Sequence, residues 1–182
     1  GNKIERAPYQ PGSGMVHNST VNPRMATVRL LLAKAAQNRW KVHSTDASNA
    51  FAQARATNLT YAQAPPGFNE PGFVYLVAIN LYGDVAAPAA WSSLFKNFMI
   101  SQGFTVNPLE PAVFVKRVAN AAGVEKPLIV AAWVDDAIVM HESEKVVMDF
   151  KREMRKAFTG TETDSVTQFL GIQLNREPGD GA

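Results

Sequence analysis

Three aspartates occupy positions at which carboxylates could hold divalent metal ions. Asp135 and Asp136 are adjacent in the apolar run AAWVDDAIVM (131–140), and Asp46 ends the β-prone segment WKVHSTD (40–46). Two adjacent aspartates at the tip of a β-hairpin, with a third at the end of an earlier strand, can hold two divalent ions about 3.5–4 Å apart for phosphoryl transfer. Magnesium prefers hard oxygen ligands of this kind. Each aspartate taken alone has a simpler interpretation as a turn residue, a cap or a solvated charge, so the pair needs support from the rest of the chain.

The hydrophobic periodicity predicts the elements that must bring these aspartates together. Apolar residues at helical spacing predict helices over 24–38, over a segment around Trp91 to Met99 that Gly103 ends, and over 144–158. Short β-prone runs predict strands at 40–46, 58–63, about 73–81, 112–118, 128–134, 137–141 and 167–174. This order predicts an α+β fold, in which an antiparallel sheet carries its helices on one face and the ends of its strands bring Asp46 opposite Asp135.

The composition is that of an ordinary globular protein. The chain has 182 residues, of which 46% are hydrophobic and 19% charged, so one domain can bury a core. Its formal net charge of +2 predicts weak attraction to nucleic acid unless the basic residues cluster. The absence of cysteine excludes disulfides and thiolate metal sites. No apolar run reaches the length of a membrane span.

Three segments differ in their patterning. Residues 1–23 are rich in Gly, Pro, Asn and Ser and show neither helical nor strand periodicity, which predicts an extended arm. Residues 24–176 carry the periodic elements and form the predicted domain, and residues 177–182 form a short tail. A long unpatterned arm becomes ordered mainly by lying along another surface, which favours a protein partner.

Several stretches together resemble the reverse transcriptase domain of Copia-type retrotransposons. They are RMATVRLLLAKAAQNRW, VHSTDASNAF, QAPPGF, LYGDVAAPAAW, WVDD and FLGIQL, in the same order and at similar spacing. The resemblance implies a reverse-transcriptase-like palm with part of the fingers. It also implies that Asp46, Asp135 and Asp136 are the catalytic carboxylates that bind Mg²⁺, and that Phe51 takes the place of the steric gate against ribonucleotides.

The chain departs from the family pattern around the nucleotide pocket. Where the family has leucine, lysine, glutamine and arginine, this chain has Asp84, Val85, Ala86 and Ala89, and Ser48 stands where the family has a lysine. The family glutamine lies in the nucleotide pocket, so Ala86 marks that position. Because phosphoryl transfer depends on positioning and charge neutralisation, these changes remove much of what would hold a triphosphate.

Two functions follow from these observations. The first is a reverse-transcriptase-derived palm without polymerase activity that serves as a structural or docking subunit, with other protein subunits as partners, weak contact with nucleic acid, and magnesium binding that is weak or absent. For this function we expect exposed apolar surface near Trp91 to Met99, at Phe104 and on FLGIQL. The second is an active RNA-directed DNA polymerase core that uses two metal ions, and the three aspartates favour it.

Overall fold

The computed structural model describes residues 21–68, 72–119, 123–163 and 166–175. The predicted tail and all but the last three residues of the predicted arm lie outside the described residues. Within the described part of the chain, none of the helices combines the length and the apolar character that crossing a bilayer requires.

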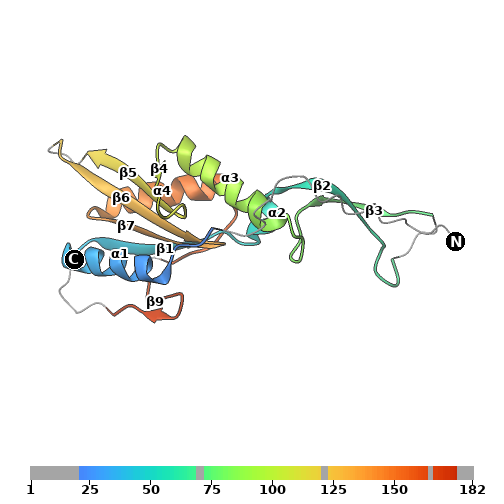
Figure 1. The fold of residues 1–182 in the computed structure, drawn as a ribbon, viewed down its shortest axis with the longest axis horizontal. Helices are drawn as coiled ribbons and strands as arrows, with labels where there is room; N and C mark the ends of the chain where they lie inside the picture. Colours follow the sequence, from blue (N-terminus) through green and yellow to red (C-terminus); the bar gives the residue numbers. More distant parts are fainter. Residues whose placement is uncertain (1–20, 69–71, 120–122, 164–165, 176–182) are drawn as a thin grey trace.

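A six-stranded sheet forms the centre of the domain (Figure 1). All the strand pairs in it are antiparallel. In spatial order the strands are β4 (Thr105–Val106), β5 (Val113–Ala119), β6 (Glu125–Trp133), β7 (Asp136–His141), β1 (Lys41–Asp46) and β8 (Glu162–Thr163). The two strands that carry the aspartates, β7 and β1, are therefore neighbours near the middle of the sheet, where both are flanked by further strands.

Helices cover both faces of this sheet. The helices α3 (Ala87–Ser101) and α4 (Glu144–Ala157) pack on one face, where their apolar residues join Phe114, Val130 and Val139 in one core. The helix α1 (Met25–Gln37) packs on the other face, against Ile138 and Met140. The expectation of helices on a single face holds for α3 and α4 but is wrong for α1. Helical periodicity shows that a helix has an apolar side but not which face of the sheet that side covers.

The apolar residues of α3 lie inside the domain. Trp91 and Phe95 pack against Phe158 with ring centroids 5.2 and 6.1 Å apart, and Phe104 packs against Phe150. These rings are buried, and so is Met99. The expectation that this region leaves an exposed apolar surface is therefore wrong, because α4 and the residues that follow it cover α3.

The predicted strand over 167–174 is a tight hairpin instead. Its strands are β9 (Gln168–Phe169) and β10 (Ile172–Gln173), and its turn residues Leu170 and Gly171 have φ of 49° and 77°. A two-residue turn with positive φ at both positions joins antiparallel strands without splaying them. Phe169 is buried against the α1 face of the sheet. The predicted exposure of this segment is thus also wrong for its aromatic residue.

A second hairpin extends from the body of the domain (Figure 1). It follows the short helix α2 (Ala50–Gln53) and consists of β2 (Arg55–Ala62) and β3 (Tyr75–Ile79), which pair with each other in a separate two-stranded sheet. Asn80 holds its base, because the buried side chain donates from Nδ2 to the carbonyl oxygens of Ala54 (2.9 Å) and Arg55 (3.0 Å). In the part of the chain that the structure describes, these bonds anchor the hairpin at the end that follows α2, and we name it the β2–β3 hairpin.

A carboxylate fixes the start of α1 over the sheet. Glu110, in the loop before β5, accepts hydrogen bonds from Thr27 Oγ1 (2.8 Å) and from the backbone and side chain of Arg24. The bonds from Thr27 and then Arg24 hold the pKa of Glu110 below its ordinary value. This tie keeps α1 on the face of the sheet that carries Asp46 and Asp136.

Candidate catalytic centre

Asp46 and Asp136 lie directly opposite each other on neighbouring strands. Asp46 is the last residue of β1, Asp136 is the first residue of β7, and the two are Cα partners in the antiparallel register. Directly paired residues project from the same face of a sheet. Both residues line one cavity of about 450 Å³, whose wall also includes Thr161, β9 and the turn residue Leu170. The residue that faces Asp46 is thus Asp136 rather than the expected Asp135.

Asp135 lies in the turn between β6 and β7. Its backbone oxygen accepts a hydrogen bond from Ala47 N at 2.8 Å, and it does not belong to the wall of the cavity that Asp46 and Asp136 share. The preceding residue, Val134, has φ of 54°, a conformation that is unusual for a β-branched side chain. Among the described residues, no group of three or more His, Cys, Asp or Glu side chains is arranged to hold a metal ion. The structure therefore pairs Asp46 with Asp136 in one cavity, and Asp135 lies outside its wall but close enough for its charge to act on Asp136.

Short polar contacts hold the Asp46 carboxylate. Ser48 Oγ donates to Asp46 Oδ2 at 3.0 Å, Thr161 Oγ1 lies 3.4 Å from the same oxygen, and Asp46 N donates to Thr161 O at 3.0 Å. In the sequence, Ser48 was notable only because the family has a lysine at this position. Its bond to Asp46 shows that the shorter side chain has a structural role at the centre.

The pKa of Asp136 is raised above its ordinary value. The largest cause is burial, followed by the negative charges of Asp135 and Asp46. No lysine or arginine is among the described residues that line the shared cavity. A divalent cation would offset this repulsion, and carboxylate oxygens are suitable ligands for Mg²⁺. The donor set therefore fits such an ion, and Asp46 and Asp136 are the residues that would hold it.

The raised pKa of Asp136 leads to a prediction about stability. Because the folded-state pKa of Asp136 is raised above the ordinary value of 3.8, the folded protein binds this proton more tightly than the unfolded chain does. Stability is therefore lost as the pH rises from that ordinary value through the raised pKa. In chelator-treated buffer at pH 7, we expect Asp136→Asn to raise the Tm by about 1–3 °C, and the difference to disappear below pH 3.8.

Thermal unfolding followed by circular dichroism checks this expectation. Glu125→Gln is the matched control, because Glu125 is an exposed carboxylate at the start of β6, away from the aspartates. Its Tm should stay unchanged. A lower Tm for Asp136→Asn at pH 7 would mean that the carboxylate makes favourable contacts that outweigh the repulsion.

The two predicted nucleotide-binding positions lie outside the shared cavity. Phe51 is in α2, where its ring centroid is 4.9 Å from that of Tyr82. Ala86 directly precedes α3, and its backbone N donates to Asp84 Oδ1 at 2.9 Å. Neither Phe51 nor Ala86 is among the residues that line the cavity of Asp46 and Asp136. Asp84, which departs from the family pattern, thus bonds the backbone at the start of α3.

Two further residues that sequence reasoning missed position this centre. Gly160 lies so close to β1 that a Cβ atom on it would be 1.8 Å from the carbonyl oxygen of Asp46. Trp91 Nε1 donates to Val134 O at 2.6 Å, which ties α3 to the turn before Asp135. A glycine shortly after a helix indicates a turn, and a tryptophan at helical spacing indicates a core residue. Neither signal reveals a contact with a distant strand.

Comparisons with known proteins place the chain in a sequence family. The reverse transcriptase (RNA-dependent DNA polymerase) family matches residues 9–180. The chain is 25% identical over 175 residues to a retrovirus-related Pol polyprotein from transposon RE1 of Arabidopsis thaliana, and 24% identical to that from transposon RE2. Each match covers 93% of this chain and 12% of the relative. A putative transposon Ty5-1 protein of Saccharomyces cerevisiae is 27% identical over 134 residues, covering 72% of this chain and 42% of that protein.

No solved structure matches the chain. The family match, in contrast, spans nearly the whole chain, including both strands that carry the paired aspartates. The resemblance to Copia-type retrotransposon sequences is confirmed by the Arabidopsis relatives. The chain therefore belongs to the reverse transcriptase (RNA-dependent DNA polymerase) family.

Proposed function

We propose that this chain is a reverse-transcriptase-derived palm domain that lacks polymerase activity and docks to other proteins in a larger assembly. The observation that carries the proposal is the exposed apolar surface of the β2–β3 hairpin. Because the chain spans 12% of the length of the Arabidopsis relatives, its activity and partners are inferred from its own residues.

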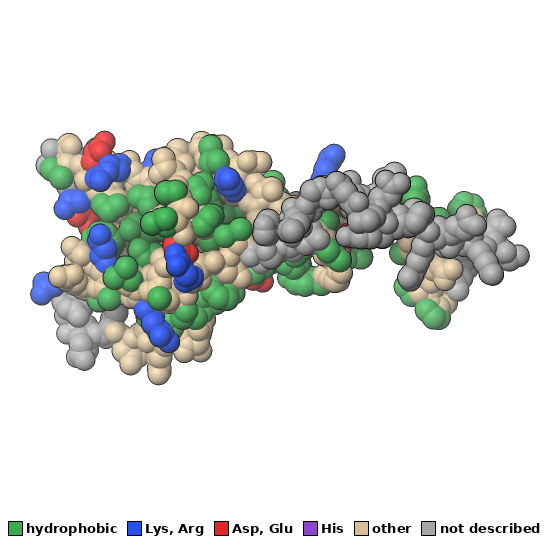
Figure 2. All heavy atoms as spheres, viewed as in Figure 1, with side chains coloured by type: hydrophobic (Ala, Val, Ile, Leu, Met, Phe, Trp, Pro, Cys, Tyr) green, Lys and Arg blue, Asp and Glu red, His purple; other side chains and the backbone are tan. Residues whose placement is uncertain are grey.

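The β2–β3 hairpin exposes large apolar side chains on both strands and in the loop. Phe68 and Phe73 are more than 70% exposed, and every residue of β3 except Val77 is exposed. Figure 2 shows hydrophobic side chains along this projecting part of the molecule. Other exposed apolar residues of the hairpin and its base are Tyr61, Val74, Tyr75, Leu76, Ile79, Leu81 and Tyr82. Exposed apolar side chains gathered on one part of a protein often mark an interface.

The backbone of the hairpin also favours a protein partner. β2 and β3 pair only with each other in the described residues, so each has an outer edge of unpaired backbone groups. Such edges can accept another strand, and an isolated two-stranded hairpin is marginally stable in water. A protein partner that adds a strand to one edge would pair its backbone groups, and the same partner could bury the exposed apolar side chains.

Charge argues against nucleic acid as the partner of this surface. Residues 56–95 contain no lysine or arginine, so this part of the chain offers no counterion release on contact with phosphates. On the face shown in Figure 2, most of the Lys and Arg side chains lie over the body of the domain instead. Contact with nucleic acid is accordingly weak.

Site-specific photocrosslinking tests the docking proposal. With a benzophenone amino acid at Leu76 of β3, we expect a discrete adduct with one protein in an extract of the source cells. The same probe at Leu30 of α1, which is 68% exposed, is the matched control and should give no adduct. Excess unmodified chain should compete for the adduct, whereas excess Leu76→Lys chain should not. Equal labelling at both positions, or none at either, would contradict the proposal.

An active RNA-directed DNA polymerase core is the alternative function. The observation in its favour is the register of Asp46 and Asp136, which puts two carboxylates in one cavity with a third close by in the sequence. In such an enzyme these residues would hold Mg²⁺, which neutralises charge on the transferring phosphoryl group. The chain's own residues would orient the ion through Ser48 and Thr161, which contact Asp46.

Primer extension distinguishes the two functions. We expect no templated incorporation by the chain with either Mg²⁺ or Mn²⁺, because Val85, Ala86 and Ala89 lack the groups that would hold a triphosphate. Ala86→Gln alone should not restore activity, because it returns one of several missing groups. Incorporation that Asp136→Asn abolishes would establish the enzyme and overturn this expectation.

A further inference from the structure

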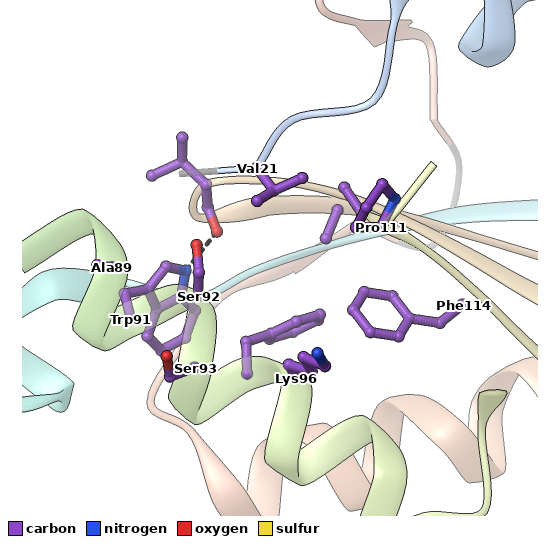
Figure 3. A pocket seen from close by; sticks show the side chains of 12 residues that line it. Val21, Ala89, Trp91, Ser92, Ser93, Lys96, Pro111 and Phe114 are labelled. Atoms are coloured by element: carbon purple, nitrogen blue, oxygen red, sulfur yellow. Dashed lines mark hydrogen bonds between the residues drawn. The ribbon is translucent and has the colours of Figure 1, made fainter. Parts of the chain in front are cut away.

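A cavity of about 250 Å³ lies between α3 and the edge of the sheet (Figure 3). Its wall includes the rings of Trp91, Phe95 and Phe114, all of which are less than 10% exposed. Its polar lining consists of two serines of α3 and Lys96, and Ser93 and Lys96 are exposed at its rim. A largely apolar wall with a few polar groups is the composition of a small-molecule site. This cavity is separate from the one that Asp46 and Asp136 share.

The cavity touches the turn of Val134 and Asp135, which precedes Asp136. Val134 belongs to its wall, and Val134 O accepts the hydrogen bond from Trp91 Nε1. The positive φ of Val134 is a strained backbone state that persists only when its surroundings hold it. A molecule in this cavity would contact both Trp91 and Val134. It would therefore stabilise the turn and the position of Asp135 that follows it.

The size and chemistry of the wall define the ligand. An apolar cavity of about 150 Å³ holds benzene, so about 250 Å³ accepts two fused aromatic rings. Aromatic walls favour a planar ring that can pack offset or edge-on against them. Among the described residues, Lys96 is the only lysine or arginine that lines the cavity, and it forms an ion pair with none of their carboxylates. Its ammonium group therefore favours a ligand with an anionic group at the mouth of the cavity.

We propose that this cavity binds a planar aromatic carboxylate and that its binding stabilises the turn at Val134 and Asp135. The rings lie against Trp91 and Phe114, and the carboxylate accepts a hydrogen bond from Lys96 Nζ at the rim. The serine hydroxyls of Ser92 and Ser93 supply further donors near the mouth. This site does not depend on whether the domain polymerises nucleotides or docks to proteins.

A nuclear magnetic resonance titration with 2-naphthoate tests the site. We expect saturable shifts of the signals of the Trp91 indole N–H and of the backbone N–H groups of Val134 and Asp135. Asp135 does not line the cavity, so a shift of its signal would report the effect on the turn. The neutral analogue 2-naphthalenemethanol has the same rings and should bind more weakly. The Trp91 signal is assigned by its loss in Trp91→Phe, because the chain has three tryptophans.

Two variants separate this site from binding elsewhere. Lys96→Gln should weaken 2-naphthoate by up to roughly fivefold and leave the neutral analogue unchanged, because a partly exposed ion pair contributes up to about 1 kcal/mol. Lys34→Gln, which changes an exposed lysine of α1, is the matched control and should alter neither affinity. Ala89→Leu adds bulk to the wall and should abolish binding of both probes while the rest of the spectrum remains that of a folded protein.

The same titration can overturn the proposal. Absence of saturable shifts at Trp91 up to millimolar 2-naphthoate would exclude the site. Shifts that persist in Ala89→Leu would show that the probe binds elsewhere. Binding that leaves the Asp135 signal unmoved would exclude the effect on the turn.

Discussion

Gly160→Ala should lower the free energy of unfolding by more than about 3 kcal/mol, because its new methyl group would overlap with backbone atoms that cannot move away easily. The added Cβ would lie 1.8 Å from Asp46 O, 2.9 Å from Asp46 C and 3.3 Å from Ala47 Cα. The chain around residue 160 must then withdraw from the end of β1. That movement would also break the bond from Asp46 N to Thr161 O and disturb the contacts of the Asp46 carboxylate.

Urea unfolding of the variant and of a matched glycine variant checks this result. Gly67→Ala is the control, because Gly67 has φ of 92° but no atom within 4 Å of an added Cβ. The free energy of unfolding of Gly67→Ala should fall by only about 1 kcal/mol, because alanine is less stable than glycine at a positive φ. If Gly160→Ala were no less stable than Gly67→Ala, the close approach of this segment to β1 would be wrong.

Trp91→Ala should lower the free energy of unfolding by about 3–5 kcal/mol, since it removes a large buried ring and leaves a cavity. Trp91 is 2% exposed and packs against Phe95 and Phe158 with ring centroids 5.8 and 5.2 Å apart. The substitution also removes the donor to Val134 O. We therefore expect the backbone signals of Val134 and Asp135 to shift and broaden in the nuclear magnetic resonance spectrum.

Trp91→Phe separates packing from hydrogen bonding. It retains an aromatic ring in the core but leaves the carbonyl of Val134 without its partner, so we expect a smaller loss of about 1–2 kcal/mol. The signals of the turn should change in both variants, whereas the large loss of stability should occur only in Trp91→Ala. Equal stability of Trp91→Ala and the unsubstituted protein would show that the ring is not part of the core.

Much of the fold is determined locally and could be read from the sequence. The apolar residues of α4, Val147, Phe150 and Met154, recur at helical spacing and are buried as that spacing predicts. The strands β5, β6 and β7 coincide closely with their apolar runs. Asp135 and Asp136 interrupt one such run and were identified for that reason. The family match confirmed the resemblance that these segments carry together.

The predicted exposure of α3 was wrong, and it shows that local sequence patterns do not determine which apolar residues reach the surface. The aromatic residues of α3 are apolar at helical spacing, and the sequence alone did not show that Phe158 covers them. The apolar residues of β3 alternate less clearly, yet they are the exposed ones. Exposure depends on which other elements pack nearby, and those elements are far away in the chain.

Only the tertiary structure decided which carboxylates meet. The register of β1 and β7 pairs Asp46 with Asp136, and the turn sends Asp135 outside their shared cavity. A shift of one residue in that register would turn the opposite set of side chains towards the cavity, because successive residues of a strand point to opposite faces. The close approach of Gly160 to Asp46 depends on the same long-range pairing. The sequence therefore determined which residues are available for a metal site, and the strand register determined which of them lie together.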